Sequence, residues 1–187
     1  MSQLLVRSDC LVLVVDVQER LAPAVADGAT VVERCRLLVE AARRLGVPVI
    51  ASEQYPKGLG PTLEAVRTSL GDSPRIAKLA FSCAREPEIL RAVRASGRRT
   101  LLVTGMEAHV CVLQSALGFL DEGFAVAIVA DATGSRRPES RTLALERARA
   151  AGCAVIDVEM AIFEWLERAG TDEFRTISPW IREGRVP

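Results

Sequence analysis

Unbroken apolar runs of strand length alternate with helical stretches along nearly the whole chain. The clearest run is Cys10-Leu11-Val12-Leu13-Val14-Val15. It lacks the apolar–polar alternation of a strand with one face in water, so it predicts a strand that is buried on both faces. Such strands belong to a parallel sheet between two layers of helices, which limits the chain to a three-layer α/β architecture.

Six mainly parallel strands are expected, in the ranges 10–16, 48–52, 75–79, 100–105, 125–130 and 154–157. The intervening stretches carry one apolar stripe each, which is typical of crossover helices. Because these crossovers are right-handed, few topologies remain, and we expect a doubly wound sheet in the order 3-2-1-4-5-6. Thr171 to Pro187 is expected to form a terminal helix and tail that contributes to subunit contact.

The composition bounds the class of protein and its partners. With 187 residues, the chain is expected to form one domain over 1–187. Its 24 basic and 24 acidic residues balance, which gives no electrostatic case for binding nucleic acid or an anionic membrane. No apolar run of membrane-spanning length occurs. Five scattered cysteines, and an N-terminus without the order of a signal peptide, predict a cytoplasmic protein.

The topology brings two distant segments to one crevice. In an open parallel sheet, ligands bind outside the carboxyl ends of the strands, at the point where the strand order reverses. In the expected order, that point lies between the first and fourth strands. Asp16 ends the first strand, and the loop from Gly105 to Cys111 follows the fourth. We therefore expect Asp16 and Cys111 to meet there.

Cys111 stands at the start of a predicted helix. The unpaired N–H groups and the positive end of the helix dipole favour a thiolate at this position, and the same N–H groups could bind an oxyanion. A buried small apolar residue is the alternative interpretation. Cys83, after the third strand, is the second candidate thiol.

Lys78 ends the third strand in an apolar setting, Ile76-Ala77-Lys78-Leu79. A buried ammonium needs a partner, and Asp16 would suit; the alternative is a lysine that reaches solvent from an edge strand. His109, the only histidine, lies two residues from Cys111 on the same tight loop, which makes it a weaker candidate for a catalytic base. One histidine with these cysteine spacings also predicts no zinc site.

Together these segments resemble the isochorismatase-like cysteine hydrolases, and in particular the isochorismatase-domain-containing subgroup. The resemblance covers nearly the whole chain and is carried by Val15-Asp16-Val17-Gln18, the segment from Glu53 to Thr62, Lys78, Gly105-Met106-Glu107-Ala108-His109-Val110-Cys111-Val112 and Val129-Ala130-Asp131-Ala132. The Asp-x-Gln segment, the lysine after the third strand and the segment that contains Cys111 occur in this order. Together they are far more specific to the family than any one of them.

The resemblance implies a Rossmann-like isochorismatase fold and a catalytic triad of Asp16, Lys78 and Cys111. Asp16 would take the thiol proton and return it to the leaving group, and Lys78 would stabilise the thiolate. The family also implies a cis peptide bond between Met106 and Glu107, and an oxyanion hole formed by the backbone N–H groups of Glu107 and Cys111.

Two departures from relatives in the superfamily narrow the expected activity. Nicotinamidases carry an aspartate and histidine metal site after the second strand, but residues 52–62 contain no histidine. Isochorismatases that cleave a vinyl ether have glycine where this chain has Cys111. The resemblance therefore favours a metal-independent and cofactor-free hydrolase that cleaves an amide or related C–N bond of a small molecule.

The rim of the crevice and the alternative functions follow from the same pattern. Gln18, Tyr55, Phe81 and Arg136 lie on loops that should overlook the crevice and are the candidate substrate-binding residues. The family implies a homo-oligomer. A small-ligand or nucleotide-binding module is disfavoured by the lack of a glycine-rich phosphate loop. A non-catalytic member that uses Cys111 as a redox sensor remains the other alternative.

Overall fold

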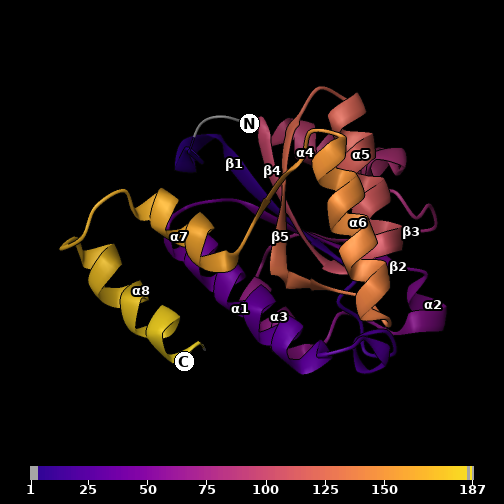
Figure 1. Cartoon of the computed structure of the whole chain (residues 1–187), viewed down its shortest axis with the longest axis horizontal. Coiled ribbons are helices and arrows are strands. Elements are labelled where there is room, and N and C mark those ends of the chain that lie inside the picture. Colours follow the sequence, from indigo (N-terminus) through magenta and orange to yellow (C-terminus); the bar gives the residue numbers. More distant parts are fainter. Residues whose placement is uncertain (1–3, 185, 187) are drawn as a thin grey trace.

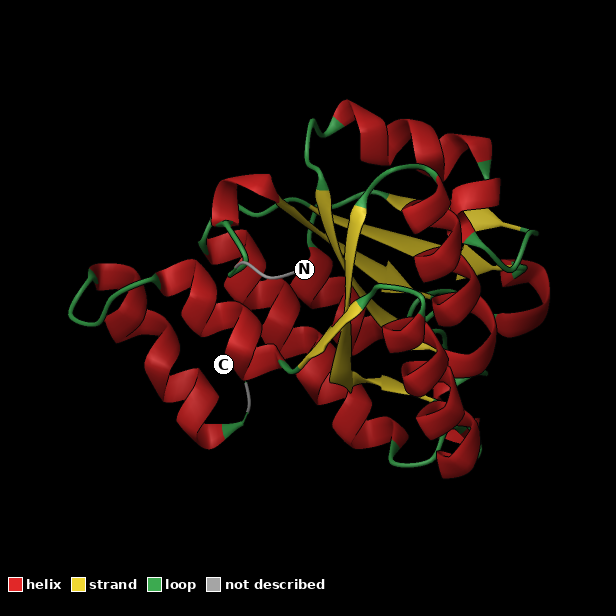
Figure 2. Cartoon of the chain, turned by 45° about the horizontal axis from the view of Figure 1, so that its top comes forward, coloured by secondary structure: helices red, strands yellow, loops and turns green. Residues whose placement is uncertain are grey.

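The computed structural model describes residues 4–184 and Val186, which form a six-stranded parallel sheet between two layers of helices (Figures 1 and 2). The strand order β3-β2-β1-β4-β5-β6 confirms the expected topology. The strands are β1 Cys10–Val15, β2 Val49–Gln54, β3 Arg75–Lys78, β4 Thr100–Met106, β5 Ala125–Gly134 and β6 Ala154–Ile156.

Helices follow the strands and return the chain to the opposite edge of the sheet. They are α1 Gly28–Arg44, α2 Pro56–Leu59, α3 Glu64–Leu70, α4 Pro87–Ala95, α5 Leu113–Asp121, α6 Pro138–Ala150, α7 Val158–Leu166 and α8 Asp172–Glu183. A one-turn π-helix, Ala108–Val112, links β4 to α5. The expected terminal helix is α8, while Arg185 and Pro187 of the expected tail lie outside the described residues.

Strand β1 shows why the chain needs two helical layers. All six of its residues are buried, and successive side chains point to opposite faces of the sheet. Val12 and Val14 join the core under α1, α3, α7 and α8, whereas Leu11 and Leu13 join the core under α4, α5 and α6. Each of these buried side chains contributes about 1.5–3 kcal/mol relative to an exposed one.

Two strands run further than the sequence pattern indicates. The apolar run of β2 stops at Ser52, but the strand continues to Gln54 because β3 pairs with it there, opposite Lys78. Strand β5 reaches Gly134 through an irregular register beside β4. Both extensions lie at the carboxyl edge of the sheet, so they change which side chains reach the crevice.

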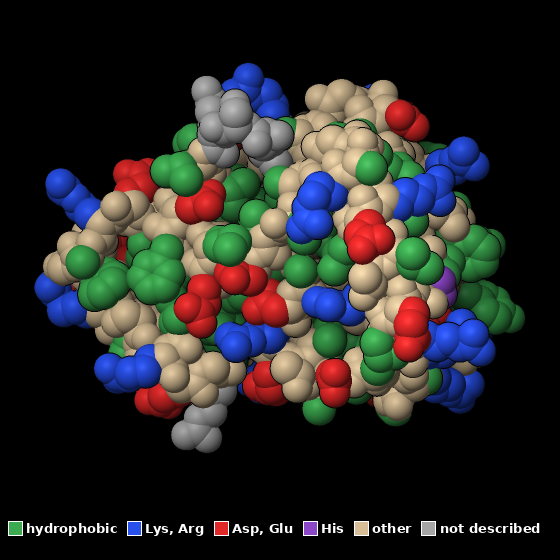
Figure 3. Space-filling view, viewed as in Figure 1, with side chains coloured by type: hydrophobic (Ala, Val, Ile, Leu, Met, Phe, Trp, Pro, Cys, Tyr) green, Lys and Arg blue, Asp and Glu red, His purple; other side chains and the backbone are tan. Residues whose placement is uncertain are grey.

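The described residues contain no helix that is long and apolar enough to cross a membrane. On the face seen in Figure 3, acidic and basic side chains are interspersed over the helices and form no broad field of one sign.

Gly105 of β4 pairs with Val15 of β1, and its replacement tests the close approach of the two strands. Its φ is +113°, and a Cβ there would lie 2.0 Å from the backbone oxygen of Val15. We expect Gly105→Ala to lower the free energy of unfolding by more than about 3 kcal/mol, as measured by chemical denaturation. Gly97→Ala is the control, because Gly97 has a positive φ but no atom within 4 Å. Equal losses for the two variants would contradict this account.

Candidate active site

Asp16 lies at the switch point, where β1 ends between β2 and β4. Its φ is +54°, a left-handed conformation that aspartate tolerates better than most residues with a Cβ. Its N–H donates to the carbonyl of Ser52 at 3.1 Å, and its Oδ1 accepts a hydrogen bond from Ser52 Oγ at 2.6 Å. The carboxylate is fully buried, and the hydrogen bond from Ser52 of β2 fixes its orientation.

Lys78 brings the opposite charge from β3. Its Nζ lies 2.8 Å from Asp16 Oδ2, and both side chains are 0% exposed. Strand β3 alternates between exposed and buried residues, and Lys78 is on the buried side with Ile76. The structure therefore shows the expected pairing with Asp16 and not a lysine that extends to solvent.

Three acceptors occupy the hydrogens of the ammonium. Nζ donates to Gln54 Oε1 at 2.6 Å and to the carbonyls of Ala80 and Phe81, both at 3.2 Å. Asp16 Oδ2 is the ion-pair partner of this ammonium, at 2.8 Å from Nζ. Burial lowers the pKa of Lys78, but the charge of Asp16, the thiol groups of Cys83 and Cys111 and the contact with Asp16 together outweigh burial and raise the pKa. The ammonium and the carboxylate therefore lie against each other inside the protein.

Cys111 completes the cluster from the π-helical turn before α5. Its side chain is nearly enclosed, and its Sγ lies 4.0 Å from Gln54 Oε1. Burial, followed by the negative charge of Asp16, raises the pKa of the Cys111 thiol, while the Lys78 ammonium offsets part of the increase. Burial and the Asp16 charge therefore act against the thiolate that the helix start favours.

The other candidate groups have different surroundings. Cys83 is fully buried, its Sγ donates to Ser52 Oγ at 3.5 Å, and burial raises the pKa of its thiol to about 11. His109 directs Nδ1 to Ser135 Oγ at 3.0 Å, on the side of the β5–α6 loop. Neither Cys83 nor His109 has the same set of partners as Cys111.

Gln54 was not among the expected site residues, because its strand was predicted to end at residue 52. Its side-chain amide joins two of them: Oε1 accepts from Lys78 Nζ and faces Cys111 Sγ, while Nε2 donates to the carbonyl of Leu79. Its backbone is clamped by Gln18, whose Oε1 accepts from Gln54 N and whose Nε2 donates to Gln54 O. The sequence offered one signal for this role: Gln54 lies two residues after the predicted end of a buried strand.

The four candidate substrate-binding residues divide into two groups. Tyr55 and Phe81 are about half exposed, at 53% and 54%, and follow the strands that carry Gln54 and Lys78. Arg136 is exposed, and its Nε donates to Glu107 Oε1 at 2.8 Å. Gln18 is fully buried, and its amide is occupied by Gln54 and Gly60. Its expected contact with substrate stays a prediction.

The turn before Cys111 also has the backbone that the resemblance implies. The Met106–Glu107 peptide bond is cis, and Glu107 is buried, with Arg136 as its partner. Among the described residues, no three histidine, cysteine, aspartate or glutamate side chains are grouped as they would be to hold a metal ion.

Fold and cluster together define a doubly wound α/β protein with a buried carboxylate, ammonium and thiol at the switch point. A family profile described as Isochorismatase domain matches residues 10–160, and the chain belongs to this family, which has a hydrolase fold. It is 37% identical over 184 residues to the secreted isochorismatase effector Isc1 of Phytophthora sojae, covering 96% of this chain and 87% of that protein. It is 34% identical to isochorismatase domain-containing protein 2 of Homo sapiens, covering 90% and 80%.

Solved structures share the same architecture. The MAR1 ribonuclease from Caenorhabditis elegans has a TM-score of 0.91 at 28% identity and covers 99% of this chain and 95% of its own. YcaC from Pseudomonas aeruginosa, solved with hexane-2,5-diol and covalent acrylamide, has a TM-score of 0.90 at 27% identity, with coverage of 100% and 94%. YcaC from Escherichia coli, an octameric hydrolase of unknown specificity, has a TM-score of 0.91 at 25% identity, with coverage of 98% and 94%.

The buried ion pair makes a prediction about stability. Lys78→Met leaves Asp16 buried without its cation, and we expect a loss of about 3–5 kcal/mol in the free energy of unfolding. Adding Asp16→Asn to Lys78→Met should recover part of that loss, because no unpaired charge is then buried. Denaturation of the two single variants and the double variant measures the coupling. Strictly additive losses would show that the two charges do not interact.

Proposed function

We propose that the protein hydrolyses an amide or related C–N bond of a small molecule through a covalent intermediate on Cys111, without a metal ion or cofactor. The observation that carries this proposal is the buried Asp16 carboxylate, whose Oδ2 lies 2.8 Å from the Lys78 ammonium and whose charge, after burial, raises the pKa of the Cys111 thiol. A thiol that is protonated at rest needs a base at the moment of attack, and Asp16 is that base.

The reaction begins with attack of Cys111 Sγ on the carbonyl carbon while the thiol proton passes to Asp16. Lys78 stabilises the negative charge that develops beside it. The backbone N–H groups of Glu107 and Cys111 are the proposed donors to the tetrahedral oxyanion. Asp16 then gives its proton to the leaving nitrogen, the C–N bond breaks, and a thioester remains on Cys111.

Water completes the cycle. Asp16 takes a proton from a water molecule as its oxygen attacks the thioester carbon, and the C–S bond breaks. The proton on Asp16 returns to the sulfur, which regenerates the thiol. The sum is amide plus water to carboxylic acid plus amine, so the enzyme ends in its starting state without a metal or a redox partner.

Two further observations favour this function over its alternatives. Acrylamide is an electrophile that adds to thiols, and the covalent acrylamide in the Pseudomonas aeruginosa YcaC structure supports a reactive thiol in a related protein. Redox sensors use accessible thiols of low pKa, whereas burial raises the pKa of Cys111. We also propose a homo-oligomer, as in the octameric Escherichia coli neighbour, and retain the cytoplasmic location as a prediction.

Replacing the nucleophile tests the reaction directly. We expect Cys111→Ala to abolish hydrolysis across a panel of small amides, because no other thiol faces Asp16 in this way, and to leave the far-ultraviolet circular dichroism unchanged. Cys153→Ala, in the link between α6 and β6, is the matched control and should retain turnover. A Cys111→Ala protein with full activity would refute the covalent mechanism.

Single-stranded RNA belongs in the same panel, because solved neighbours are named MAR1 ribonucleases. The balance of 24 basic and 24 acidic residues gives no broad attraction for a polyanion, and we expect no cleavage of RNA. Cleavage of RNA that is lost in Cys111→Ala, with no turnover of amides, would replace the proposed substrate class.

The raised pKa of Cys111 makes a prediction about pH. Only the thiolate reacts with iodoacetamide, so the rate of Cys111 alkylation should rise roughly tenfold for each pH unit between 7 and 9 and show no plateau there. Mass spectrometry of timed digests measures the rate at Cys111. A plateau below pH 7 would indicate a preformed thiolate and remove the need for Asp16 as a base.

A further inference from the structure

A basic cavity is lined in part by His109, a residue of the turn that carries Cys111. The volume of the cavity is about 430 Å³, and its other lining residues are Arg136, Arg137 and Ser140. Two of the four side chains are guanidinium groups, and none is acidic. The Asp16–Lys78–Cys111 cluster uses none of these residues, so the cavity needs an explanation of its own.

The guanidinium groups of the two arginines are only partly paired with carboxylates. Arg136 directs Nε to Glu107 Oε1, which fixes the side chain and leaves its two terminal nitrogens without a carboxylate. Arg137 forms no ion pair or hydrogen bond through its side chain among residues 4–184 and Val186. A fixed guanidinium fork matches the oxygens of a carboxylate or phosphate.

Two neighbouring groups add donors to the same cavity. His109 uses Nδ1 toward Ser135, so its Nε2 is the ring nitrogen left for another partner. Ser140 lies in the first turn of the 13-residue helix α6, whose N-terminus has no side-chain cap. N–H groups in a first turn have no partner earlier in the helix. They strengthen an anion site here, although the site rests on the basic side chains.

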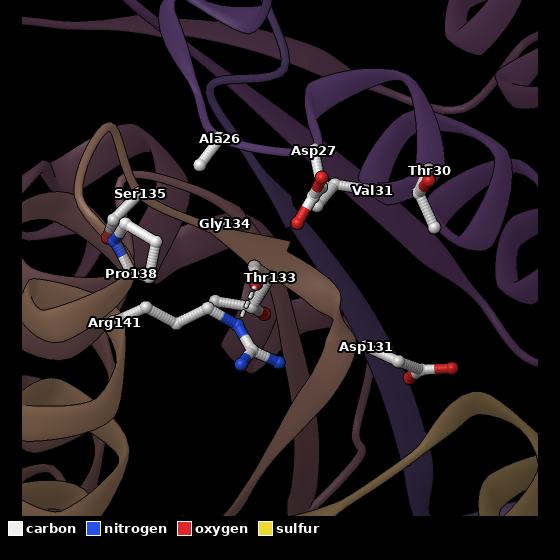
Figure 4. Close-up of a pocket in the computed structure, with 10 residues that line it drawn as sticks. All are labelled: Ala26, Asp27, Thr30, Val31, Asp131, Thr133, Gly134, Ser135, Pro138 and Arg141. Carbon is white, nitrogen blue, oxygen red and sulfur yellow. Dashed lines mark hydrogen bonds between the residues drawn. The ribbon is translucent and has the colours of Figure 1, made fainter.

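A second cavity differs from the first in the charge of the residues that line it. The cavity of about 260 Å³ in Figure 4 is also next to α6, but it is lined by two carboxylates, Asp27 and Asp131, and by a single arginine. That arginine, Arg141, donates to the carbonyls of Thr133 and Ala130. Its charge is therefore balanced locally, in contrast to the charge of the cavity that contains Arg137.

The basic cavity and the proposed nucleophile share one turn of the backbone. His109 belongs to the same π-helical turn as Cys111, Ala108–Val112. Arg136 is held by Glu107, the residue directly before that turn. A group that occupies the cavity thus contacts the frame that positions Cys111.

We infer that this cavity binds the anionic group, a carboxylate or phosphate, of the molecule that Cys111 attacks. This inference rests on the proposed function and narrows its substrate class to amides that carry a separate acidic group. Neutral amides of the same size would lack the contacts to Arg136 and Arg137.

Binding can be measured without turnover, by calorimetric titration of inorganic phosphate into the full-length Cys111→Ala protein. We expect Arg137→Gln in that background to weaken phosphate binding about tenfold. Arg147→Gln is the matched control, because it removes the same charge from the far end of α6, where Arg147 is exposed and outside the cavity. Equal effects of the two variants, or no phosphate binding, would overturn the anion site.

Substrate preference is measured with the active enzyme, on pairs of amides that differ only in a free carboxylate or its methyl ester. Arg137→Gln should reduce the preference in kcat/KM for the acid about tenfold, and Arg147→Gln should preserve it. Inorganic phosphate should inhibit hydrolysis of the acid competitively and so raise its KM. Competitive inhibition would show that phosphate and the acidic group of the substrate bind at the same site, and not at two different sites. An enzyme that hydrolyses both members of each pair equally well would refute the inference and keep the hydrolase. Phosphate binding that depends on Arg137, with no amide turned over, would refute the proposed function and keep the anion site.

Discussion

The contact between Asp16 and Lys78 is the interaction on which the rest of the site depends. Two charges that are both 0% exposed carry a large desolvation cost, so neither is tolerated without the other and without further polar partners. Those partners come from separate segments: Ser52 and Gln54 from β2, and the carbonyls after β3. The pair therefore ties the ends of three neighbouring strands into one arrangement.

The pair also sets the chemistry of the thiol. A helix start and an ammonium nearby both favour a thiolate, yet burial and the carboxylate have the larger effect and raise the pKa of Cys111. These effects favour the protonated thiol beside a carboxylate that is paired with Lys78. That combination suits a proton transfer coupled to attack and is unfavourable for a thiol that reacts freely with oxidants.

The surroundings of the Cys111 turn have two different electrostatic characters. Cys111 is close to the enclosed Asp16–Lys78 pair, whose charges balance. His109 of the same turn lines a cavity with Arg136 and Arg137, where Glu107 engages only one of the two guanidinium groups. Cations that are close to solvent and incompletely paired are more costly to keep together than separate ones, which is why they point to an anionic occupant.

The strand order followed from the sequence, because buried parallel strands joined by right-handed crossovers allow few topologies, and that order placed Asp16 and the loop ending in Cys111 at one crevice. The sequence left open whether Lys78 pairs with Asp16 or reaches solvent. It also did not fix the reach of β2, the burial of Gln18, the position of Gln54 between Lys78 and Cys111, or the raised pKa of Cys111. Strand ends depend on pairing with a neighbour, and a pKa depends on burial and on charges from distant segments. Such effects arise only when the chain is folded, so the tertiary structure alone decided them.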